Sequence, residues 1–160
     1  MELGMNRVAE IIEQLELLPH PEGGYYKEVY RSEMEVQSPV HGLQRNSLTH
    51  IYFLLGKGQF SRFHMVSHDE VWNFYEGEPL VLILFDGETV QELELGSGCS
   101  DGYTAVVPAG VWQAAYSTGD YSLVGCSVAP GFDFEDFQFM ENEQNIQCLS
   151  SQFPHLKTYI

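Results

Sequence analysis

The chain has 160 residues, of which 44% are hydrophobic and 13% aromatic, and its 23 acidic against 7 basic residues give a formal charge of -16 at pH 7. This length suits one domain, and the apolar content is enough to form a core, which excludes a disordered chain. A surface this acidic repels phosphate backbones, and no apolar run reaches the roughly 18 residues of a membrane helix, so neither a nucleic-acid nor a membrane partner is expected.

Residues 1–20 are predicted to form one amphipathic helix. The apolar side chains that recur at helical spacing are Val8, Ile11, Ile12, Leu15 and Leu18. Asn6 is the expected N-cap, and Pro19 is expected to end the helix. Acidic residues run through this segment and no small-residue cleavage pattern follows it, so we interpret it as part of a cytoplasmic protein and not as a secretory signal.

From residue 24 to 139 the pattern changes to short strands separated by Gly and Pro turns, which favours an all-β barrel or sandwich. After 47–55, the expected strands are 59–66, 71–76, 79–85, 89–95, 103–107, 111–116 and 121–129. Residues 33–46 show no periodicity and are predicted to be a mobile loop. The alternating Phe residues of 132–139 are expected to cover the barrel or a partner subunit. Residues 140–160 are predicted to hold a short helix and a tail.

The stretch FHMVSHDEVWNFYEG, residues 63–77, carries the densest set of chemical groups in the chain. Side chains two apart on a strand share a face, so Arg62, His64 and Val66 are predicted to point into the barrel together with Phe60. Glu70 begins the next strand and is expected to fold back beside His64. Such a pair in an apolar cavity is where shifted pKa values and metals tend to occur.

These residues resemble the first motif of the cupin superfamily, because Gly58, His64, Glu70 and Gly77 fit its spacing, with Val66 in place of its second histidine. The second motif is matched by Gly102, Pro108 and Gly110, with Gln113 in place of its histidine and Ser117 in place of its asparagine. Segments such as PHPEGGYYKEVYRS and VPAGVWQAAY further resemble a small cupin subgroup described as similar to dTDP-keto-sugar epimerases. The resemblance implies a double-stranded β-helix, the cupin jelly-roll barrel, commonly as a homodimer.

Metal-binding cupins hold their ion with three histidines and a glutamate, and two of those four positions here are Val66 and Gln113. Valine offers no lone pair and a neutral amide is a weak ligand, so we expect no metal and no other cofactor. His68 is interpreted as a solvated turn residue. His20, His41, His50 and His155 share no spacing, and surface or core roles are expected for them.

Without a metal, His64 held by Glu70 is suited to act as a general base. Epimerases of the cupin type pair such a base with a tyrosine acid, and Tyr116, Tyr25 and Tyr52 are the candidates here. The alternative is that His64 and Glu70 only satisfy each other in the barrel core.

We expect a small-molecule ligand, carbohydrate-like by the resemblance, on which the site performs epimerase or isomerase chemistry. The residues predicted to bind it are Tyr25, Arg31, Tyr52, Trp72 and Gln113. A non-catalytic binding or sensing module is the alternative function, and a metal-dependent cupin enzyme is a third.

Overall fold

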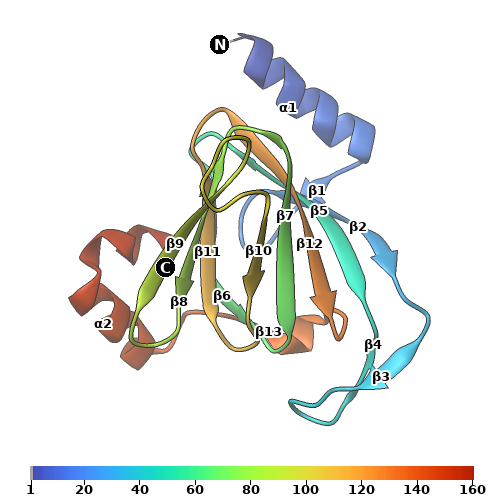
Figure 1. Ribbon diagram of the computed structural model, residues 1–160, viewed down its shortest axis with the longest axis vertical. Coiled ribbons are helices and arrows are strands. Elements are labelled where there is room, and N and C mark those ends of the chain that lie inside the picture. The colour runs from blue at the N-terminus through green and yellow to red at the C-terminus, as the bar shows by residue number, and fades with distance from the viewer. Residues whose placement is uncertain (1) are drawn as a thin grey trace.

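The strand pattern folds into two antiparallel sheets packed face to face, seen in a computed structural model that describes residues 2–160, with side chains from residue 6 onward (Figure 1). The larger sheet has the strand order β1 (Leu18–Pro19), β2 (Tyr25–Arg31), β5 (Thr49–Gly56), β12 (Tyr121–Ala129), β7 (Asp69–Gly77) and β10 (Thr104–Val107). The smaller sheet has the order β13 (Phe137–Phe139), β6 (Phe60–Val66), β11 (Trp112–Ser117), β8 (Leu80–Phe85) and β9 (Val90–Leu95). The all-β cupin jelly-roll prediction is therefore confirmed.

The main core lies between the two sheets, where each strand contributes every second side chain. Phe53, Trp72, Leu82 and Val124 are among its fully buried members. All six residues of β8 are buried because both faces of that strand are covered. Strand and turn limits lie within about two residues of the predicted ranges, since the turns follow the Gly and Pro positions.

Helix α1 (Glu2–Leu15) lies outside the larger sheet and packs Ile11 onto it. The helix begins before Asn6, so Asn6 is not its N-cap, and it ends before Leu18, which is 66% exposed and belongs to β1. Both helix limits predicted from these residues are wrong, because Leu18 and Pro19 pair with β2 and not with the preceding turn. In the described part of the chain, no helix combines the length and apolar character that crossing a membrane requires.

The C-terminal segment covers the outer face of the smaller sheet. Helix α2 (Glu143–Gln152) agrees with the predicted short helix, and the 3-10 helix η2 (Pro154–Tyr159) follows it. Leu149 and Leu156 are buried against residues of β6, β8 and β11. This second cluster explains why both faces of the smaller sheet are apolar.

Residues 33–46, which we call the arm, form a hairpin of β3 (Glu35–Gln37) and β4 (Gln44–Asn46) that projects from the barrel (Figure 1). The segment predicted to be a mobile loop thus contains two short strands that pair in regular register, and its mobility stays a prediction. Residues 131–139, which we call the lid, comprise the 3-10 helix η1 (Phe134–Asp136) and β13, and pair with β6. The lid thus covers the barrel, as predicted.

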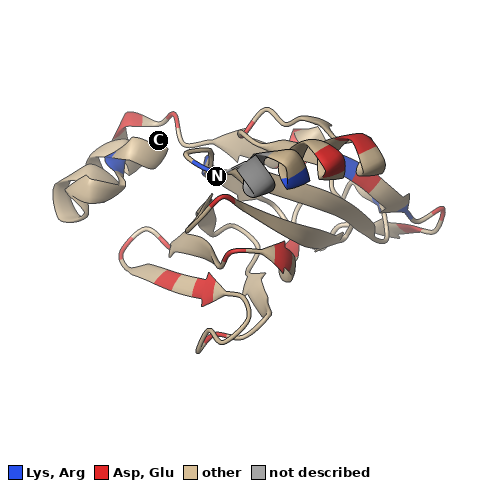
Figure 2. Cartoon of the chain, turned by 90° about the horizontal axis from the view of Figure 1, so that it is seen from above, with Lys and Arg blue, Asp and Glu red and all other residues tan. Residues whose placement is uncertain are grey.

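Acidic residues lie in helices, strands and loops along the chain, with few basic residues between them (Figure 2), and the formal charge is -16 at pH 7. The field outside the barrel is therefore negative, which matters for the charge of any ligand that approaches it.

Candidate functional site

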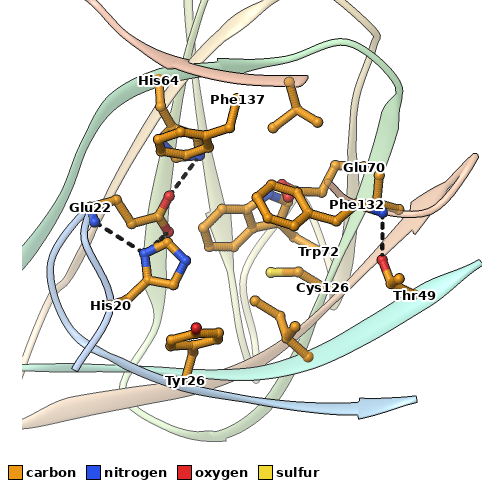
Figure 3. A pocket seen from close by; sticks show the side chains of 13 residues that line it. His20, Glu22, Tyr26, Thr49, His64, Glu70, Trp72, Cys126, Phe132 and Phe137 are labelled. Carbon is orange, nitrogen blue, oxygen red and sulfur yellow. Dashed lines mark hydrogen bonds and ion pairs between the residues drawn. The ribbon is translucent and has the colours of Figure 1, made fainter. Parts of the chain in front are cut away.

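A cavity of about 40 Å³ lies between the sheets, closed on one side by the lid (Figure 3). Its apolar walls combine the aliphatic side chains of Ile51, Val66 and Val128 with the aromatic rings of Tyr26, Trp72, Phe132 and Phe137. The titratable groups that line it are His20, Glu22, His64, Glu70 and Cys126. The predicted placement of His64 and Glu70 on one polar site inside the barrel agrees with this arrangement.

His64 is paired with Glu22 and not with the predicted Glu70. Its Nε2 lies 3.0 Å from Glu22 Oε2, and both side chains are almost fully buried. Glu22 reaches this position from the loop before β2. The backbone carbonyl of Glu22 accepts a hydrogen bond of 2.9 Å from Arg62 N, which fixes the loop against β6. The carboxylate partner of His64 therefore comes from 42 residues earlier in the chain.

Two glycines allow that loop to lie against β6. Gly23 has φ +109° and Gly24 has φ +74°, and a Cβ at Gly23 would stand 2.2 Å from Phe60 O. Only glycine combines these angles with so close a backbone approach. The sequence PHPEGG predicts the sharp turn, but that turn also delivers Glu22 into the cavity, which the sequence reading missed.

The hydrogen bonds of His64 define its protonation. Nδ1 donates to the carbonyl of Arg62 at 2.7 Å, so a neutral ring would direct a lone pair from Nε2 toward the Glu22 carboxylate. Burial is the largest single effect and disfavours the imidazolium, but Glu22, Glu70 and the Arg62 carbonyl together raise the pKa of His64. For Glu22, burial is likewise the largest single effect, but His64, His20 and Ser61 together lower its pKa. The pair is thus an imidazolium and a carboxylate.

Glu70 is the second carboxyl group of the cavity, and it does not pair with His64. Its Oε2 is buried and has no hydrogen-bond partner among the described residues. Burial raises the pKa of Glu70 to about 7, with a further contribution from Glu22, against the opposing effects of His64, Gln113 and Trp72. A carboxyl group with this pKa is divided between its protonated and ionised forms near neutral pH.

Gln113 and Trp72 form the floor beside Glu70. Trp72 Nε1 donates to Gln113 Oε1 at 2.8 Å, and both residues are buried. Gln113 is thereby oriented with its amide oxygen committed to the indole. Trp72 lines the cavity as predicted, whereas Gln113 stands just behind it.

The four positions that hold metal in metal-binding cupins do not fit an ion here. Val66 lines the cavity without a donor atom, and the oxygen of Gln113 already accepts from Trp72. Both ring nitrogens of His64 are engaged, one by Arg62 O and the other by Glu22. We therefore derive no chemistry through a metal at this position.

The tyrosines predicted as acids lie elsewhere. Tyr25 and Tyr52 pack in the cluster beneath helix α1, on the outer face of the larger sheet. Tyr116 stacks on Tyr159 at a ring separation of 5.6 Å, outside the smaller sheet. Tyr26 lines the cavity instead, because neighbouring residues of β2 point to opposite faces of the sheet and Tyr25 points to the outer one.

A β-bulge changes which residues of β6 face inward. β11 pairs Gln113 with His64 but Ala115 with Ser61, so β6 has one extra residue between these pairs. His64 and Val66 face the cavity, as predicted. Arg62 instead stacks over the Phe139 ring at 4.3 Å, and Phe60 contacts Tyr159. The prediction that side chains of β6 alternate strictly is therefore wrong for residues 60–62, on the N-terminal side of His64.

His68 is not solvated but is 3% exposed, and it lies beside His41 and Asp136. His41 Nε2 donates to Asp136 Oδ1 at 2.8 Å, since its Nδ1 accepts from Leu43 N. Arg45 Nε adds a hydrogen bond of 2.8 Å to the same carboxylate. This cluster fastens the arm to the lid, and the arginine supplies the positive charge that a metal would otherwise bring.

An outer groove of about 490 Å³ adjoins the cavity and shares Tyr26, Thr49, Ile51 and Phe132 with it. Arg31, predicted to bind ligand, lines this groove. Its guanidinium bonds Asn46 Oδ1 and the Phe132 carbonyl, each at 2.9 Å, and so helps to position the lid.

Two antiparallel sheets enclosing a polar cavity define a protein with a cupin barrel. The chain belongs to the cupin superfamily: the family model described as cupin superfamily (DUF985) matches residues 9–140.

Three relatives support this assignment. The uncharacterized protein YML079W of Saccharomyces cerevisiae is 31% identical over 157 residues, with 88% of this chain and 78% of that protein covered. A hypothetical protein from Leishmania major has a TM-score of 0.82 at 30% identity, with 95% of both chains covered. Protein SO0799 from Shewanella oneidensis has a TM-score of 0.77 at 35% identity, with 93% of this chain and 91% of that chain covered. None of these names states an activity.

Proposed function

We propose that the barrel holds a small-molecule site in which Glu70 exchanges a proton with the ligand without the help of a metal. The reaction class that this serves is epimerisation or isomerisation, which removes and replaces a proton next to a carbonyl group. The predicted resemblance to keto-sugar epimerases supports a carbohydrate-like ligand.

The observation that carries this proposal is the state of Glu70. A buried carboxyl with a pKa of about 7 and an unpartnered oxygen can give or take a proton at neutral pH. A purely structural carboxyl in a core is expected to have both oxygens hydrogen-bonded.

This proposal assigns the role of general base, which the sequence predicted for His64, to Glu70. Glu70 is the proposed base, and the ion pair of His64 with Glu22 forms the polar wall of the site beside it. Tyr26 replaces Tyr116 as the proposed acid, since it lines the cavity. The larger part of the ligand would lie in the outer groove beside Arg31.

The test is proton exchange in deuterium oxide, followed by NMR on a panel of keto sugars and keto-sugar nucleotides. Wild-type protein is expected to exchange the proton next to the carbonyl, and Glu70→Gln to bind the same compound without exchange. Binding without exchange by the wild type across the panel would favour the non-catalytic module. About one metal per chain in protein purified without chelator would overturn the metal-free mechanism.

We also propose a homodimer formed through the free edge of β2 and the arm. The edge of β2 opposite β5 pairs with β1 only at Tyr25 and Tyr26 among the described strands, and Tyr30 beyond it is 53% exposed. Met34 on the arm is 71% exposed. Sedimentation should show a dimer that Tyr30→Glu dissociates. Tyr103→Glu is the matched control, since Tyr103 is 56% exposed at another surface, and equal behaviour of both variants would contradict this interface.

A further inference from the structure

The charges inside the cavity do not balance when Glu70 is ionised. His64 and Glu22 neutralise each other at 3.0 Å. His20 accepts a hydrogen bond at Nδ1 from Glu22 N, and burial lowers its pKa, so it stays neutral. Among the described residues that line the cavity, none is Lys or Arg.

The strands around Glu70 supply no free positive charge from the described residues that line the cavity. β6 supplies His64, which is already paired with Glu22 of the loop before β2. β11 supplies the neutral amide of Gln113, and β12 supplies Cys126, whose thiol pKa is raised well above its ordinary value by burial. The Nε2 of Gln113 is likewise buried without a partner among the described residues, so it is a neutral donor that faces this region and adds no charge. In the described part of the chain, an ionised Glu70 therefore has no counter-charge beyond the His64 that Glu22 already neutralises, and its Oε2 is a place where a ligand can provide one.

The walls of the cavity suit a cation as well. Tyr26, Trp72, Phe132 and Phe137 line it, and aromatic rings attract cations through the negative potential of their faces. An anionic group would instead meet the carboxylates, and a hydrocarbon group would leave Glu70 Oε2 unsatisfied.

The size of the cavity limits that cation. About 40 Å³ corresponds to roughly three water-sized positions, at about 10–15 Å³ each. A primary ammonium with one attached carbon fits this space, while the rest of a ligand must lie in the outer groove.

We propose that the cavity binds a compact ammonium group, held by Glu70 within the aromatic walls, so that the natural ligand is a small primary amine. This proposal deepens the proposed function. It rests on that function in one respect, namely that the molecule bound in the cavity is also the one that reacts. The formal charge of -16 favours the approach of such a cationic ligand.

The experiment uses methylammonium chloride as the probe, with methanol as the neutral analogue and sodium formate as the anion, at pH 8 and constant ionic strength. The readout is the indole N–H resonance of Trp72, identified by its persistence in Trp112→Phe. Methylammonium is expected to shift this resonance saturably, and methanol and formate are expected not to.

Glu70→Gln should weaken methylammonium binding at least tenfold, because it removes the charge at nearly constant volume. Glu92→Gln is the control, since Glu92 is exposed on β9 and its loss changes the net charge equally. An equal response to methanol, a preference for formate, or equal binding by both Gln variants would overturn the proposal. If Glu70→Gln does not fold, the comparison of the three probes on wild-type protein still decides.

This result is independent of turnover. Methylammonium binding without proton exchange in any substrate would leave the ammonium site standing and refute the proposed catalysis. Proton exchange in a neutral keto sugar without methylammonium binding would support the proposed catalysis and refute the ammonium site.

Discussion

Replacing Glu70 by Gln is expected to stabilise the protein at alkaline pH while leaving its stability at acidic pH nearly unchanged. The pKa of Glu70 is about 7 in the folded protein against an ordinary 4.5, mainly because the cavity desolvates the carboxylate. Below pH 4.5 the group is protonated in both states and contributes no difference. Between 4.5 and 7 the unfolded chain loses this proton first, so the stability of the wild type falls with rising pH.

The size of the effect follows from the two pKa values. Each pKa unit is equivalent to about 1.4 kcal/mol, so the wild type should lose about 3 kcal/mol through this group above pH 7. The Gln variant never ionises and avoids this loss. The difference between the two proteins isolates Glu70, because all other titrating groups are common to both.

The measurement is urea unfolding at pH 4.5 and at pH 8.5 for wild type, Glu70→Gln and the surface control Glu92→Gln. Glu70→Gln should exceed the wild type by about 3 kcal/mol at pH 8.5 only. The reasoning would be refuted if the two proteins differed by the same amount at both pH values, or if the variant were the less stable one at pH 8.5.

Three further outcomes are expected. Glu22→Gln should lower the free energy of unfolding by about 3 kcal/mol at pH 7, measured by urea titration, because it leaves a buried imidazolium unpaired; no loss would mean that the pair is not charged. Gly24→Ala should cost about 2 kcal/mol, since a Cβ there would stand 2.6 Å from Leu54 O. Gly98→Ala has a similar φ of +79° with no atom nearby, so it should cost less; equal losses would contradict the steric argument. Asp136→Asn should speed proteolysis within residues 33–46, followed by mass spectrometry, because this carboxylate anchors the arm; an unchanged cleavage rate would show that the anchor is dispensable.

The barrel and the positions of His64 and Glu70 could be predicted because both depend on local patterns. Turn residues mark where strands end, and the spacing from Gly58 to Gly77 places His64 and Glu70 on neighbouring strands. Trp72 was placed correctly for the same reason, since strand alternation from Glu70 fixes its side.

The partner of His64 could not be found in this way. Glu22 lies in a loop, where no periodicity tells which side chain turns inward, and only the contact of that loop with β6 brings it to the cavity. Predicting that His64 would pair with Glu70 assumed that the nearest acid in the sequence is the nearest in space.

Strand phase accounts for the remaining errors. The extra residue in β6 turns Arg62 outward, and one residue of phase on β2 separates Tyr26 from Tyr25. Neither change alters the hydrophobic pattern enough to be seen, because both faces of these strands meet apolar neighbours. Tyr116 was misplaced for a related reason, since the C-terminal segment buries the outer face of its strand.

The contact of His64 with Glu22 also bears on the order in which the protein matures. Glu22 arrives with the N-terminal loop, whereas Phe137, which stacks on His64 at 5.2 Å, arrives with the lid near the other end of the chain. A nascent chain that has completed β6 and β7 already contains Glu22, His64 and Glu70, but it lacks Phe137 and the rest of the lid. The cavity is therefore closed only after the C-terminal part of the chain has been added, so an incompletely synthesised molecule has no enclosed site.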